Sequence, residues 1–237
     1  MLMDIFSSFD SYQFNSITAF NKTINTFIIT TPFLILLLSM TSIWPSISRI
    51  PSIVTQPLYV MFEQTMRTKS KILKGYPIIL SSLFLIIITL NLIGLIAFSF
   101  SITSQLIFTL VFGLPLWLSS LSSSMMNDKK EFVAHLLPSG APDWLNPFLV
   151  LIETISISVR PLTLSFRLAA NMTAGHIVLS LIGYYLSSAM FTLSYYPILL
   201  TLVSMGYIMF EMAICLIQAY IFCLLLSLYT DDHTSSH

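Results

Sequence analysis

The chain has 237 residues, in which ten Lys and Arg residues balance ten Asp and Glu residues to a formal net charge of zero. Hydrophobic residues make up 56% and charged residues only 8%, whereas soluble domains carry about 25% charged residues. A protein with so few charged residues cannot keep this much apolar surface dissolved in water. The composition therefore excludes an ordinary soluble domain and indicates a membrane protein. It also argues against a nucleic-acid partner, which clustered Lys and Arg would bind.

The first part of the chain predicts one membrane span and one surface helix. A span needs roughly 20 apolar residues in a helix, and residues 24–44, which follow an outer N-terminal segment over 1–23, contain no charge. In segment 52–74, apolar side chains recur near helical spacing and basic residues follow. The apolar ones are Leu58, Met61, Phe62 and Met66. This pattern is typical of an amphipathic helix on the membrane surface.

The central part of the chain predicts two further spans. Between Lys74 and Asp128 lie 53 consecutive uncharged residues, enough for two passages. We place these at 76–98 and 104–126, with the polar stretch Ser99–Ser104 as the turn between them.

The last part of the chain predicts a long helical hairpin. From Asn146 to Thr230 the sequence is apolar except for four charges. A break over Gly183–Pro197 divides it into helices at 146–184 and 194–230. The expected fold is therefore all-α, a single polytopic membrane domain with about five passages plus one interfacial helix.

The distribution of basic residues predicts the orientation. Residues 49–74 hold five Lys and Arg residues against one acid, whereas the turn at Ser99–Ser104 holds none. The positive-inside rule places the basic segment on the inner side. The N-terminus then lies on the outer side, and an odd number of spans puts the C-terminus on the inner side.

Four polar residues share one face of the helix predicted at 146–184. Around the helix, Arg160 lies about 20° from Arg167, and Glu153 and Asn171 each lie about 40° from it. A charge deep in a span costs from about 2.5 kcal/mol upward, and ionisable residues there often mark an ion path. An arginine that snorkels to the interface or pairs with another helix remains an alternative. His176 falls on the opposite side of the helix. The sequence is equally consistent with a functional role for this histidine and with a buried, hydrogen-bonded place in the core.

A second polar face lies on the last helix, where Glu211, Gln218 and Asp232 recur at multiples of seven residues. In an antiparallel hairpin, the residue numbers of any two facing residues add up to nearly the same value, which we call the index sum. The sum is 385 for Arg167 with Gln218 and for Glu153 with Asp232, and 387 for His176 with Glu211. The index sums therefore predict three levels along the hairpin: an acidic pair, an Arg–Gln pair and a His–Glu pair. Polar residues on neighbouring helices can also serve only to hydrogen-bond the helices to each other.

No metal site is expected from the two cysteines. Cys215 and Cys223 lie eight residues apart within an apolar stretch, which is typical of packing residues rather than of a disulfide or metal pair.

The segment Ser165–His176, which reads SFRLAANMTAGH, resembles the signature of subunit a of F-type ATP synthases. Four further segments are similar to the mitochondrial, particularly the animal, version of this family; they are 91–95, 115–117, 135–142 and 217–220. The similarity extends from about residue 76 to the end of the chain.

The resemblance implies a subunit of the mitochondrial inner membrane that translocates protons, is not an enzyme by itself and carries no cofactor. Arg167 corresponds to the arginine that faces the rotor, a ring of c subunits, in this family. Other membrane-sector and peripheral-stalk subunits are the further partners that the resemblance implies. The N-terminus is then expected on the intermembrane-space side and the C-terminus on the matrix side.

The resemblance also implies roles for the other polar residues. His176 and Glu211 occupy positions of the outer half-channel, and Glu153 and Asp232 occupy acidic positions of the inner half-channel. The remaining positions near the arginine are Asn171, Gln218 and Arg160, of which the last is basic in some members and polar in others.

Two alternatives from other classes remain open from the sequence. An ion-coupled secondary transporter would favour discontinuous helices with Gly and Pro breaks in corresponding halves, whereas this chain has seven glycines and no repeat. A purely structural membrane subunit would tolerate the loss of its mid-membrane charges.

Overall fold

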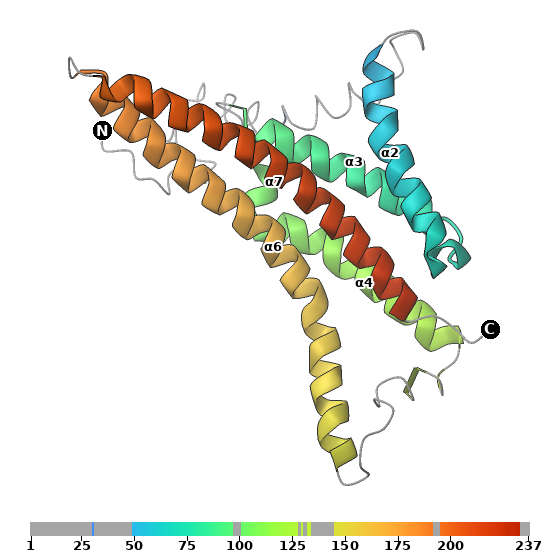
Figure 1. The fold of residues 1–237 in the computed structure, drawn as a ribbon. Coiled ribbons are helices and arrows are strands. Elements are labelled where there is room, and N and C mark those ends of the chain that lie inside the picture. The colour runs from blue at the N-terminus through green and yellow to red at the C-terminus, as the bar shows by residue number, and fades with distance from the viewer. Residues whose placement is uncertain are drawn as a thin grey trace, which may run out of the picture.

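The computed structural model describes Thr30 and residues 49–96, 101–127, 129, 132–133, 145–191 and 195–232. Every regular element in these ranges is helical (Figure 1), which confirms the predicted all-α fold. The long helices are α2 Arg49–Arg67, α3 Tyr76–Gly94, α4 Leu106–Asn127, α6 Asn146–Ala189 and α7 Tyr196–Asp232. Two 3-10 helices, η2 Lys69–Ile72 and η3 Ile102–Ser104, precede α3 and α4.

Four helices in the described part of the chain, α3, α4, α6 and α7, are long and apolar enough to cross a membrane. They agree with the spans that composition and charge spacing indicate, and they make the chain a multi-pass membrane protein. The span predicted at 24–44 lies outside the described residues, so the count of five passages stays a prediction.

The helix found where we predicted a surface helix, α2, is shorter than the predicted segment 52–74. α2 ends at Arg67, because hydroxyl groups beyond it bind main-chain carbonyls and give the backbone an alternative to the helix. Thr68 Oγ1 donates to Thr65 O at 2.8 Å, and Ser70 Oγ donates to the same oxygen at 2.9 Å. The chain then turns through η2 and through Gly75, whose φ of +85° lies in the left-handed region that suits glycine.

Helices α6 and α7 form the predicted hairpin and pack side by side (Figure 1). α6 passes through Gly183, where we expected the break to begin, and ends at Ala189. A glycine inside a helix costs only about 1 kcal/mol relative to alanine, and the apolar sequence continues beyond it. α6 also changes direction in its first half (Figure 1), the half that contains Pro161, a residue that removes a helical hydrogen bond.

The buried core surrounds α3, which packs against both α2 and α7. Leu80 of α3 and Cys223 of α7 are fully buried there, and Cys223 Sγ lies 3.7 Å from the Leu80 carbonyl oxygen. Cys215 Sγ lies 3.5 Å from Met172 Sδ, in the contact between α7 and α6. Both cysteines are free thiols that pack between helices, as predicted.

Candidate functional site

The register of the α6–α7 hairpin determines which polar residues meet. Three contacts define it: Cys215 with Met172, Glu211 with Gly175, and Tyr229 with Arg160. The facing residues have index sums from 386 to 389, close to the 385 and 387 that the polar residues alone predict. The hairpin is therefore antiparallel in nearly the expected register, and it brings residues that are 36 to 69 positions apart in sequence into contact.

Glu211 is an acidic side chain enclosed between the two long helices. It is only 2% exposed, and its carboxylate lies directly against the Cα of Gly175. A Cβ at position 175 would overlap that carboxylate, and even the farther oxygen, Oε2, would lie only 2.8 Å from it. Gly175 thus leaves the space that the carboxylate occupies. Since His176 is the next residue, the structure places Glu211 and the half-buried His176 at the same level of the hairpin.

Arg167 lies on the open side of α6. Its side chain is exposed, and Leu162 and Phe166 beside it are 46% and 47% exposed. Within the described part of the chain Arg167 forms no ion pair, so no acidic side chain described here neutralises it. Asn171, one helical turn further on, is half-buried, and so is Gln218 on α7. A guanidinium on an apolar exposed face is suited to meet a carboxylate from outside this chain.

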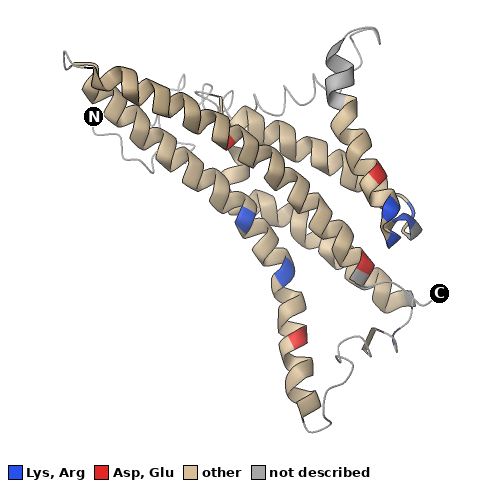
Figure 2. Ribbon diagram, in the orientation of Figure 1, with Lys and Arg blue, Asp and Glu red and all other residues tan. Residues whose placement is uncertain are grey.

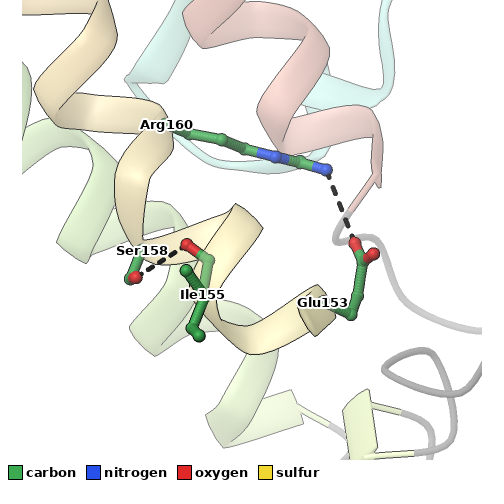
Figure 3. Close-up of polar contacts among 4 residues, drawn as sticks. All are labelled: Glu153, Ile155, Ser158 and Arg160. Atoms are coloured by element: carbon green, nitrogen blue, oxygen red, sulfur yellow. Dashed lines mark hydrogen bonds and ion pairs between the residues drawn. The ribbon is translucent and has the colours of Figure 1, made fainter. Parts of the chain in front are cut away.

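Glu153 and Arg160 lie below Arg167 on the same helix. Arg160 Nη2 lies 3.9 Å from Glu153 Oε1, as Figure 3 shows, and the two side chains are 25% and 38% exposed. The Arg160 guanidinium carbon also lies 5.3 Å from the ring centre of Tyr229, which connects this level to α7. Such partly exposed contacts contribute little to stability but orient the groups involved. The side chain of Asp232, the expected partner of Glu153, lies outside the described residues.

The charged positions follow one another along α6 in a fixed order, which Figure 2 shows on the ribbon. Glu153 lies 14 residues before Arg167, a helix length of about 21 Å, and Gly175 with Glu211 lies eight residues after it, about 12 Å. The two acidic groups therefore lie on opposite sides of the arginine along the helix.

Two residues of this site were absent from the sequence-based set. Gly175 precedes His176 in the conspicuous motif, and its index sum with Glu211 is 386, so the hairpin arithmetic could have identified it. Tyr229 has no such signal, because a tyrosine near the end of an apolar helix is common at a membrane surface.

A multi-pass helical protein with ionisable groups on both sides of an exposed arginine has the features of an ion-translocating membrane subunit. A protein-family model described as "ATP synthase A chain" matches residues 21–231. The chain belongs to this family.

Curated relatives agree with this assignment. ATP synthase subunit a of Albinaria caerulea is 48% identical over 159 residues, which cover 65% of this chain and 72% of the relative. ATP synthase F(0) complex subunit a of Pelomedusa subrufa is 40% identical over 190 residues, or 79% and 82% of the two chains. The corresponding protein of Balaenoptera musculus is 40% identical over 176 residues, or 73% and 76%.

The chain is thus a proton-translocating subunit a of the Fo sector of ATP synthase, a non-catalytic component of that complex. The family membership confirms the resemblance seen in the sequence. It also sets aside the two alternatives, a secondary transporter and a purely structural subunit.

Proposed function

We propose that the α6–α7 hairpin carries two proton paths and that they meet a ring of c subunits at Arg167. The observation that carries the proposal is the position of the two acids relative to Arg167: Glu153 precedes it on α6, whereas Glu211 of α7 lies against Gly175, which follows it. Ionisable side chains inside a membrane are costly and commonly belong to ion paths. The exposed apolar surface around Arg167 is the face on which a rotor can slide.

The proposed cycle assigns a task to each level of the hairpin. A proton reaches a rotor carboxylate from the outer side past Glu211 and His176. The neutral carboxyl can then cross lipid, which an ionised one cannot do without a large desolvation cost. At Arg167 the carboxyl releases its proton to the inner path past Glu153 and Asp232. Because arginine keeps its charge, it stabilises the carboxylate and blocks a direct leak between the paths.

The half-buried amides near Arg167 have a supporting task in this cycle. Asn171 and Gln218 can hydrogen-bond water or the rotor carboxyl without adding charge. Arg160 holds Glu153 from the same helix and contacts Tyr229 on α7.

We further infer that the protein lies in the mitochondrial inner membrane, with its N-terminus on the intermembrane-space side and its C-terminus on the matrix side. The animal relatives and the basic segment after α2 support this location. Asp231 Oδ1 accepts a hydrogen bond from the Lys69 main-chain N–H at 2.6 Å, so the end of α7 lies beside that basic segment. Peripheral-stalk and other membrane-sector subunits complete the proposed set of partners.

Thiol labelling in oriented vesicles that contain the whole complex tests the two paths. In a protein with Cys215→Ala and Cys223→Ala, a cysteine replaces either Glu211 or Glu153. A small membrane-impermeant thiol reagent should reach the Glu211→Cys variant from the outer side and the Glu153→Cys variant from the inner side. The protein without cysteines controls for background. Reaction of both variants from the same side only would overturn the proposal.

A further inference from the structure

A cluster of four exposed cations begins with the last residue of helix α2 and continues beyond it. We name it the basic turn; its residues are Arg67, Lys69, Lys71 and Lys74. The stretch 67–74 contains no acidic residue. Figure 2 shows these charges together at one end of α2, away from the charged positions on α6. The mechanism proposed for the hairpin does not use them.

The basic turn has an ordered main chain. Thr68 Oγ1 and Ser70 Oγ both donate to Thr65 O, and the two hydroxyl oxygens lie 2.7 Å apart. The main-chain N–H of Lys69 donates to Asp231 at the end of α7. Because hydroxyl groups and a carboxylate hold the backbone, the cations are presented in one place at a reduced entropy cost of binding.

Exposed apolar side chains adjoin the basic turn on both sides. On α2, Tyr59, Val60 and Met66 are 61%, 56% and 46% exposed. On the first turn of α3, Ile78 and Ile79 are 66% and 50% exposed. Since α3 is apolar enough to cross the membrane from Tyr76 onward, the basic turn lies just outside the end of a span. Cations at the end of a span match the phosphate headgroup of a phospholipid, and the apolar surface directly beside them matches its acyl chains.

We infer that the basic turn binds the phosphate headgroups of anionic phospholipids, with the acyl chains along Ile78 and Ile79. A Lys or Arg near an anionic membrane surface adds about 1 kcal/mol, roughly a five-fold gain in affinity. Four such cations select strongly for an anionic over a zwitterionic headgroup. An acidic protein segment would pair with the cations but would leave Ile78 and Ile79 uncovered. A phospholipid matches both the cations and this apolar surface, so it explains the arrangement better than an acidic segment does.

The bound lipid would anchor α2 and α3 to the membrane surface at the point where Asp231 holds the end of α7. Lipid binding at this place uses residues of α2, η2 and α3 and the Asp231 contact from the end of α7, and it does not depend on the proton paths proposed for α6 and α7. Failure of one therefore leaves the other intact.

Photolabelling of the whole complex in membranes tests the inference. The probes are a phosphatidylglycerol and a phosphatidylcholine that carry the same diazirine on the same acyl chain. Peptides that contain residues 55–82 should take up at least about ten-fold more of the anionic probe. Excess inorganic phosphate should leave this labelling unchanged, whereas its loss would show that free phosphate is the ligand and overturn the inference.

Charge variants complete the test. The variant with Gln at all four positions of the basic turn should lose the preference for the anionic probe. The single variant Lys71→Gln should lower it about five-fold, and the matched Lys129→Gln, an exposed lysine after α4, should not. Lys71→Gln keeps the inference testable if the four-fold variant does not assemble. Equal labelling by the two probes, or cross-linking of the turn to an acidic protein segment in place of lipid, would refute it.

Discussion

The close contact between Gly175 and Glu211 predicts a specific defect in the variant Gly175→Ala. The added methyl group would overlap the Glu211 carboxylate, and even its farther oxygen would lie 2.8 Å away, well inside normal contact distance. The carboxylate or the helices must therefore move, and overpacking of this kind costs about 1–3 kcal/mol. A shift of about 1 Å in a transfer site can cost roughly a hundred-fold in rate. We expect proton-driven ATP synthesis to fall about ten- to a hundred-fold.

Two other glycines provide matched controls in the same hairpin. A Cβ at Gly183 on α6 or at Gly206 on α7 would meet nothing within 4 Å. Alanine favours the helix by up to about 1 kcal/mol over glycine, so these variants should keep activity and equal or better stability. Synthesis and proton pumping are measured in vesicles, with the amount of assembled complex as the reference for each rate.

A second substitution tests the steric cause. Glu211→Asp shortens the side chain by one methylene group, so the double variant with Gly175→Ala should be more active than Gly175→Ala alone. A Gly175→Ala protein that assembles and synthesises ATP at the normal rate would refute the reasoning. So would a defect that is equally large in Gly183→Ala.

Three further predictions concern other parts of the hairpin and α3. Arg167→Ala should abolish ATP synthesis in an assembled complex, and Arg167→Lys should fail too because an amine can lose its proton; coupled synthesis by either would contradict the mechanism. Cysteines in place of Lys69 in η2 and Ile96 just after α3 should react with an impermeant reagent from opposite sides, and same-side labelling would show that α3 does not cross. Tyr229→Leu removes the cation–π contact with Arg160 and should lower the synthesis rate about two- to five-fold, whereas Tyr229→Phe should not. Equal losses in both tyrosine variants would implicate the hydroxyl group instead.

The sequence alone determined the class of the protein and most of its helical layout. Charge-free stretches of sufficient length marked α3 and α4, and long apolar stretches with only four charges marked the hairpin, because lipid disfavours charges over a fixed thickness. The polar residues on the last two helices even predicted the hairpin register to within a few residues. That success has a physical basis, since helical periodicity places residues on a face without reference to any distant part of the chain.

The tertiary structure decided the contacts that depend on distances between helices. The carboxylate of Glu211 reaches the main chain of Gly175, and Asp231 reaches the amide of Lys69, 162 residues away. The described partner of Glu153 is Arg160 rather than a residue of α7. These contacts depend on how closely the helices pack, whereas periodicity specifies only the face on which a residue lies. Sequence therefore determined which polar residues share a face, and only the packing of the helices decided which atoms meet.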